Sequence, residues 1–214
     1  KGCGSSDAEA DAVANNLVRR GIKKGDRVAA LSRKNVPFLA LGYALHKIGA
    51  WLVPVNFMLQ PADVQHLIEF AEARWFFVED ALLGNVDAVL GKMACVEQFV
   101  QFSVSGKAAP AGWLAFAELA SGTADEPQVL VDNDDVATMF FTSGTESSPK
   151  GVLTSHANFC ASHLAWALNF GLAQDDRLLM SLPLIHVAGY LFSTYALANQ
   201  VTMVMTQVPQ PVQM

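Results

Sequence analysis

The residues best suited to chemistry lie in one short polar segment, residues 142–150, which reads TSGTESSPK. Lys150 adds a positive charge, and Gly144 and the following Gly151 let the main chain approach a ligand closely. The segment is also rich in hydroxyl donors, supplied by Thr142, Ser143, Thr145, Ser147 and Ser148. Hydroxyls, permissive glycines and a lysine in one turn suit the binding of a polyphosphate.

Two other interpretations of this segment need weighing. A Walker loop requires a glycine directly before the lysine and a hydroxyl after it, but Pro149 and Gly151 occupy those places. The pattern therefore disfavours a P-loop kinase or GTPase. On composition, a solvated Ser/Thr turn between two strands remains the alternative.

Three histidines are further candidates. His186 follows an apolar run, LPLI, where a histidine is often a hydrogen-bonded core residue. His156, Cys160 and His163 are spaced to share one helix face and could hold zinc. They lack a clear fourth ligand, and a cysteine on an apolar helix is usually packed in the core, so we expect no metal there. No GxSxG motif supports a serine hydrolase.

The elements around these residues alternate between helices and strands. The order βαβαβ implies parallel pairing with right-handed crossovers, so we predict a doubly wound α/β fold. The polar segment then follows the carboxyl end of a strand, where open α/β sheets bind ligands. Apolar periodicity predicts helices over 7–21, 36–49 (capped by Asn35), 61–73, 82–90, 113–120 and 155–170, and strands over 27–31, 51–55, 75–79, 95–102, 136–141, 151–154 and 201–205.

Composition narrows the class of protein. The chain has 214 residues, 52% of them apolar, and a formal charge of −6 without a basic stripe, which disfavours a nucleic-acid partner. Three widely spaced cysteines (Cys3, Cys95, Cys160) argue against a disulfide framework and for a reducing compartment, so we predict the cytoplasm.

Residues 187–206 are long and apolar enough to raise the question of a transmembrane helix. Pro183, Gly189 and scattered polar residues interrupt this part of the chain, so we favour a buried helix followed by a strand, both covered on two faces. After Gly151 the charged residues are Asp175, Asp176 and Arg177. We therefore expect that further sequence covers this region and that the chain is the front part of a larger protein.

The sequence FTSGTESSPKGV resembles the phosphate-binding signature of the adenylate-forming enzymes, [YF]-T-S-G-[ST]-T-G-x-P-K-G-V. The segments GIKKGDRVAAL, KIGAWLVPVN and SLPLIHVAGY resemble family segments in the same order. The likeness is greatest to AMP-forming fatty-acyl-CoA synthetases. It implies a first α/β subdomain over residues 1–130 and the start of a second over 131–214, with the C-terminal lid outside this chain.

The resemblance also implies a reaction. In this family a carboxylate attacks the α-phosphorus of Mg²⁺-ATP, pyrophosphate leaves, and coenzyme A captures the acyl-adenylate. His186 would lie at the carboxylate end of the acyl pocket. The β- and γ-phosphates would be held by Thr142, Ser143, Gly144, Thr145 and Lys150.

The signature departs from the family at Glu146 and Ser147, where Thr-Gly is usual. A carboxylate beside a triphosphate repels it at short range unless Mg²⁺ lies between them or the side chain turns to solvent. We favour a working variant loop over one weakened for ATP, because the flanking motif residues are intact.

The sequence has no counterpart of the family's Tyr-Gly-x-Thr-Glu segment, of its ribose-binding aspartate or of its lid lysine. We therefore expect the isolated chain to be inactive. The alternative is a truncated nucleotide-binding or interaction module, and a homodimer remains open.

Overall fold

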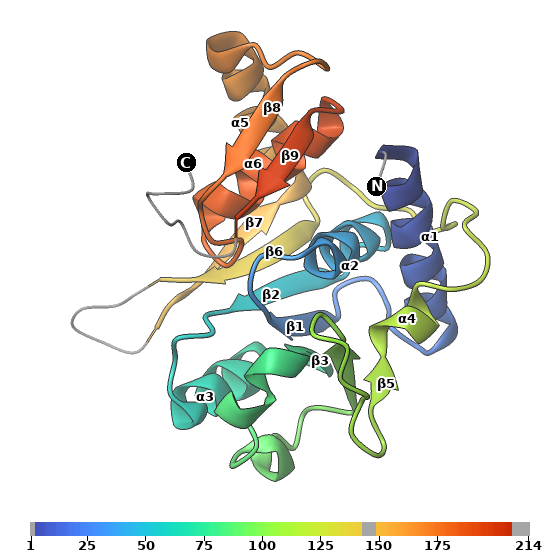
Figure 1. Cartoon of the computed structure of the whole chain (residues 1–214), viewed down its shortest axis with the longest axis vertical. Coiled ribbons are helices and arrows are strands. Elements are labelled where there is room, and N and C mark those ends of the chain that lie inside the picture. The colour runs from blue at the N-terminus through green and yellow to red at the C-terminus, as the bar shows by residue number, and fades with distance from the viewer. Residues whose placement is uncertain (1–2, 143–148, 207–214) are drawn as a thin grey trace.

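The computed structural model describes residues 3–142 and 149–206 (Figure 1). Within these residues, seven strands form one sheet in the order β5-β4-β3-β1-β2-β6-β7, and two more form a separate sheet, β8-β9. Strand pairing is parallel except between β6 and β7. The strands are β1 (Arg27–Leu31), β2 (Trp51–Val55), β3 (Trp75–Glu79), β4 (Gln98–Phe102), β5 (Leu114–Ala115), β6 (Val136–Phe141), β7 (Gly151–Ser155), β8 (Arg177–Met180) and β9 (Thr202–Met205).

The large sheet is doubly wound, as the sequence predicts. From β1 the chain moves outward to β2, then crosses back over β1 to β3 and continues to β4 and β5. Helices α1 (Cys3–Arg19) and α2 (Val36–Lys47) pack on one face, and α3 (Pro61–Ala71) packs on the other with the short 3-10 helices η1 (Asp80–Asn85) and η2 (Leu90–Lys92). The reversal brings the carboxyl ends of β1 and β3 side by side.

The central strands form where the sequence is apolar on both faces. All five residues of β3 and four of five in β1 and β2 are buried, as expected for a parallel sheet covered on two sides. Pro54 lies in β2 and has no N–H to donate. Leu52 pairs with Thr138, so the ladder between β2 and β6 is formed before Pro54 is reached.

Helix α2 has the start that the sequence predicts. The side chain of Asn35 accepts a hydrogen bond from the Phe38 N–H at 2.8 Å, and Pro37 lies in the first turn. Gly49 follows the helix with φ of 65°, a conformation that favours glycine. Seven residues of α2 are buried. The helix is therefore rigidly placed between the sheet and the later part of the chain.

Several predicted elements differ in the structure. The predicted helix 82–90 is replaced by the 3-10 helices η1 and η2, and strand β4 begins at Gln98 instead of residue 95. The predicted helix 113–120 divides into strand β5 and the four-residue helix α4 (Phe116–Leu119). Strand β5 forms by tertiary pairing, since it pairs with β4 through only two residue pairs, too few for a sequence pattern to reveal.

The remaining elements are α5 (His156–Phe170), α6 (Val187–Ala198) and the β8-β9 sheet, which group at one end of the molecule (Figure 1). The predicted helix followed by a strand is confirmed by α6 and β9. Leu179 and Val204, which pair across the two strands, are nearly half exposed, so the described residues do not cover this face. The cover expected from further sequence remains a prediction. No helix among the described residues has the length and apolar character needed to cross a membrane.

Candidate functional site

The polar segment joins β6 to β7 in a hairpin. Phe141 pairs with Gly151, and the N–H of Thr142 donates to the carbonyl of Lys150 at 3.1 Å. Thr142 and Lys150 therefore face each other at the base of the segment, and both are exposed. The other predicted phosphate ligands lie outside the described residues: Ser143, Gly144, Thr145, Glu146 and Ser147.

The hairpin base is closely packed at Gly151. A Cβ atom on Gly151 would lie 2.4 Å from Cε of Met139 and 3.3 Å from Cε1 of Phe70. A side chain at this position would require the Met139 side chain to move, and Phe70, which is exposed, to give slightly. Glycine therefore lets these two side chains pack closely against the base of the hairpin.

His186 is the residue immediately before α6, at its N-cap position. Its main-chain carbonyl accepts from the N–H of Tyr190 at 3.0 Å, and its side chain is exposed. Leu184 and Ile185 just before it are buried and anchor the segment. Among the described residues, His186 is therefore not packed in the core, and its imidazole is exposed.

The start of α6 depends on another glycine. A Cβ on Gly189 would lie 2.1 Å from the carbonyl oxygen of Pro183, so the Leu-Pro turn packs directly on the first turn of the helix. This close contact sets the position of the main chain at His186. Among the described residues, no hydrogen bond or ion pair joins the His186 side chain to Thr142 or Lys150.

Helix α2 holds α6 through polar contacts that sequence reasoning missed. Nε2 of His46 lies 3.2 Å from Oγ1 of Thr138 and 3.4 Å from the hydroxyl of Tyr190. The hydroxyl of Tyr43 donates to the carbonyl of Thr194 at 3.1 Å. The sequence could have indicated a structural role for His46, because it is a polar residue on the apolar face of a predicted helix. These contacts connect β6, which leads into the polar segment, with the helix that follows His186.

Burial keeps the His46 imidazole neutral. Desolvation, with smaller contributions from His156 and His163, lowers the pKa of His46 to about 3. Desolvation also lowers the pKa values of His156 and His163. All three rings are therefore neutral near pH 7.

His156 and His163 make packing contacts, whereas Cys160 is exposed and the expectation that it is packed in the core is wrong for the described residues. The ring of His156 contacts that of His46, with centroids 5.5 Å apart, and Nε2 of His163 lies 3.0 Å from Oγ1 of Thr194. Cys160 is a free, exposed thiol. Within residues 3–142 and 149–206, no three His, Cys, Asp or Glu side chains group as a metal site, so these residues offer none for Zn²⁺ or Mg²⁺.

A doubly wound sheet with a Ser/Thr-rich segment after the carboxyl end of β6 is typical of α/β proteins that bind ligands at this edge of the sheet. The family model described as AMP-binding enzyme matches residues 3–213, and the chain belongs to that family. The chain is 31% identical over 206 residues to the long-chain-fatty-acid-CoA ligase FadD13 of Mycobacterium tuberculosis, covering 92% of this chain and 38% of that protein.

Two further comparisons agree. The medium-chain fatty-acid-CoA ligase of Escherichia coli is 31% identical over 194 residues, with 89% of this chain and 34% of the relative covered. The solved Mycobacterium tuberculosis fatty acyl CoA synthetase superposes with a TM-score of 0.85 at 28% identity, covering 97% of this chain and 39% of that one. The chain thus spans well under half the length of these relatives.

Proposed function

We propose that the protein containing this chain is an AMP-forming acid-CoA ligase. It would activate a carboxylic acid, with a fatty acid favoured, by ATP and transfer the acyl group to coenzyme A. The observation that carries the proposal is the β6-β7 hairpin, which presents the signature segment at the carboxyl edge of a doubly wound sheet. The relatives named as fatty-acid-CoA ligases support the choice of substrate class.

The chain's own residues would contribute positioning and charge neutralisation. The exposed ammonium of Lys150 would bind phosphate oxygens and oppose the charge that develops as pyrophosphate leaves. The hydroxyls of Thr142 and Thr145, with main-chain donors at Ser143 and Gly144, would hold the β- and γ-phosphates and so present the α-phosphorus. Ser147 would add a further hydroxyl, and Glu146 would weaken binding through charge repulsion.

His186 would act at the other substrate. Its exposed imidazole, at the N-cap position of α6, would donate a hydrogen bond to the acid and orient its carboxylate for attack. Mg²⁺ would enter with ATP, held mainly by the phosphates, because the described residues group no three His, Cys, Asp or Glu side chains for a metal ion. We propose that the isolated chain does not turn over and that the protein acts in the cytoplasm.

Calorimetric titration of the chain with ATP tests the phosphate site. We expect weak binding by the chain, binding about tenfold tighter in a Glu146→Thr/Ser147→Gly variant, and weaker binding in Lys150→Met. The Mg²⁺ dependence is measured by repeating each titration with and without the ion. Lys107→Met, an exposed lysine in the connection after β4, is the matched control and should leave binding unchanged.

The reaction is tested in the protein that contains the chain. We expect pyrophosphate release that depends on both ATP and a fatty acid, with a further product on addition of coenzyme A. ATP binding without acid-dependent pyrophosphate release in that protein would instead support a non-catalytic nucleotide-binding module. Absence of both binding and release would contradict the proposed function.

A further inference from the structure

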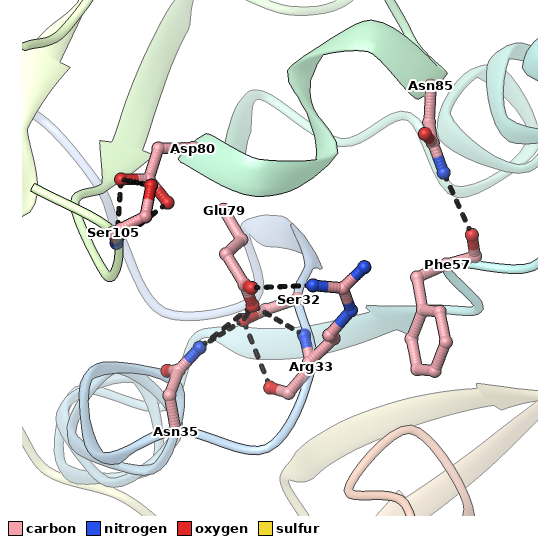
Figure 2. Close-up of polar contacts among 8 residues, drawn as sticks. All are labelled: Ser32, Arg33, Asn35, Phe57, Glu79, Asp80, Asn85 and Ser105. Carbon is pink, nitrogen blue, oxygen red and sulfur yellow. Dashed lines mark hydrogen bonds and ion pairs between the residues drawn. The ribbon is translucent and has the colours of Figure 1, made fainter. Parts of the chain in front are cut away.

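The turn between β1 and α2, residues 32–35, is held by a buried carboxylate (Figure 2). Glu79, the last residue of β3, is 1% exposed. Its Oε2 accepts from the Ser32 hydroxyl at 3.0 Å, the Arg33 N–H at 2.8 Å and the Asn35 side-chain amide at 3.1 Å. Because β1 and β3 are neighbours, Glu79 lies directly beside the turn. Three donors on one carboxylate oxygen set the main-chain path of the turn.

This turn directs Lys34 away from solvent. Lys34 is only 7% exposed, and its Nζ donates to the carbonyl of Ser181 at 2.7 Å and to that of Met180 at 3.2 Å. Within the described part of the chain, the hydrogen bonds of this ammonium go to main-chain carbonyls and not to a carboxylate. A lysine at a surface turn ordinarily extends into water, since burying an ammonium is costly. Desolvation accordingly lowers the pKa of Lys34.

The two carbonyls lie where the His186 segment begins. Met180 ends β8, and Ser181 is the first residue of the segment SLPLIH. Ser181 and Leu182 are exposed, so their side chains provide little packing at this point. The far end of the segment is set by the contact between Gly189 and Pro183. At the near end Met180 is buried and pairs with Met205, and Lys34 adds a polar tie from the large sheet to the β8-α6 connection.

We infer that Lys34 is a positioning residue for the segment that carries His186, and that Glu79 acts through the turn to hold Lys34 in place. The inference deepens the proposed function and rests on it, because the position of His186 matters for activity only if His186 meets the substrate acid. Loss of the tie would let the segment shift relative to the sheet. A displacement of about 1 Å at an orienting group is sufficient to reduce the rate of a reaction substantially.

The first part of the inference, that Lys34 holds the segment before His186 in place, is tested on the chain itself. Lys34→Met keeps the length of the side chain and removes its donors, and Lys34→Arg keeps donors. Amide hydrogen exchange over residues 180–186 and the NMR signals of the His186 ring are measured. We expect Lys34→Met to speed exchange in this segment by about tenfold and to shift the His186 signals, with Lys34→Arg restoring much of both.

Lys24→Met is the matched control, because Nζ of Lys24 also donates to a carbonyl, that of Leu130 at 3.2 Å. This variant should leave residues 180–186 and the His186 signals unchanged. Unchanged exchange in Lys34→Met, or an equal increase throughout the chain, would overturn the inference. Glu79→Gln should move the segment in the same direction as Lys34→Met, and an unchanged segment would exclude the part assigned to Glu79.

The second part of the inference, that Lys34 affects activity through His186, is tested in the protein that contains the chain. We expect Lys34→Met to raise KM for the acid by about tenfold while KM for ATP changes less than about twofold, with partial recovery in Lys34→Arg. If the unmodified protein activates no acid, the proposed function fails and the exchange result still decides the structural tie. If it is active and Lys34→Met shifts both KM values equally or neither, the positioning role of Lys34 is wrong.

Discussion

His46 is a partly buried residue whose imidazole is surrounded by groups from three elements. It faces Thr138 on β6, Tyr190 on α6, and His156, His163 and Phe159 on α5. None of these is a carboxylate that would stabilise an imidazolium. The neutral ring can accept one hydrogen bond at Nε2, so protonation would remove the acceptor as well as bury a charge.

His46 should make the protein less stable in acid. Its pKa is about 3 when folded and about 6.5 when unfolded, so below about pH 6.5 the unfolded chain takes up the proton more readily. The free energy of unfolding then falls with pH down to about 3, by about 2 kcal/mol at pH 5 from this residue. His156 and His163, with lowered pKa values, act in the same direction.

Urea denaturation at about pH 7 and pH 5 measures this effect. We expect the difference in free energy of unfolding between the two pH values to shrink in His46→Gln. His66→Gln, on the exposed side of α3, should keep the full difference. An unchanged difference in His46→Gln would show that His46 is not the acid-sensitive group.

Gly42 in α2 leaves room for the hydroxyl of Tyr190. A Cβ at this position would lie 2.1 Å from that hydroxyl, and Tyr190 is fully buried among aromatic rings. Gly42→Ala should therefore destabilise the protein by about 2 kcal/mol, although alanine is the better helix former. Thermal and urea unfolding measure the change.

A second substitution makes the Gly42 prediction specific. Tyr190→Phe removes the clashing oxygen, so Gly42→Ala should cost less in that background than in the original protein. Gly84→Ala is the control, because nothing lies within 4 Å of its added Cβ. Equal costs of Gly42→Ala in both backgrounds would contradict the clash.

At the scale of elements, α2 connects the large sheet with the later part of the chain. The turn just before α2 supplies Lys34, the middle of the helix supplies Tyr43, and its last turn supplies His46. All three contact residues of β8, α6 or the connection between them. The helix therefore does more than cover one face of the sheet: its orientation sets that of α6.

The stability of the start of α2 should depend on both polar groups of the Asn35 side chain, and not only on its capping oxygen. Its Oδ1 accepts from Phe38, and its Nδ2 donates to Ser32 and Glu79. Asn35→Ala should cost more than the approximately 1 kcal/mol of a lost cap, because Glu79 loses a donor in a buried site. Asn35→Asp keeps a capping oxygen but places a second carboxylate beside Glu79.

Comparison of the two Asn35 variants by urea unfolding separates these effects. We expect Asn35→Asp to be destabilising at pH 7 despite its capping oxygen, since the like charges repel at short range. Wild-type stability in Asn35→Asp would mean that capping accounts for the whole effect.

At the scale of the molecule, α5 and the β8-β9 sheet form one end of the structure (Figure 1), and apolar side chains on them are exposed. Leu164 and Leu168, one turn apart on α5, are 64% and 80% exposed. Leu179 and Val204 are exposed on the small sheet. Several exposed apolar side chains at one end of the molecule favour association.

The isolated chain should therefore self-associate as its concentration rises. Leu164→Glu/Leu168→Lys places a favourable charge pair on the same helix face and should reduce association in light scattering and sedimentation. Met58→Glu, which alters another exposed apolar side chain, should change association less. A wild-type chain that remains monomeric at about 100 µM would contradict this prediction.

Much of the fold follows from local sequence. Strands β1, β2, β3 and β6 occupy their predicted residues because their runs are apolar and bounded by turns, and Asn35 caps α2 as expected. Strand β8 was not predicted, since four residues after Asp175 and Asp176 carry no periodic signal and become a strand by pairing with β9. The subdomain boundary at residue 130 and the roles of His186 and the phosphate ligands remain predictions.

By itself, the sequence determined the fold class, the position of the polar segment after β6 and the resemblance to AMP-binding enzymes. These depend on periodicity, turn chemistry and short motifs, which are local in the chain. The tertiary structure decided that His186 is exposed, that His46 is enclosed by neighbouring rings and that Lys34 is buried. Those outcomes depend on contacts such as that between Lys34 and Met180, which are 146 residues apart in the sequence. A local sequence pattern cannot predict them, because the burial of a side chain depends on the packing of the whole molecule.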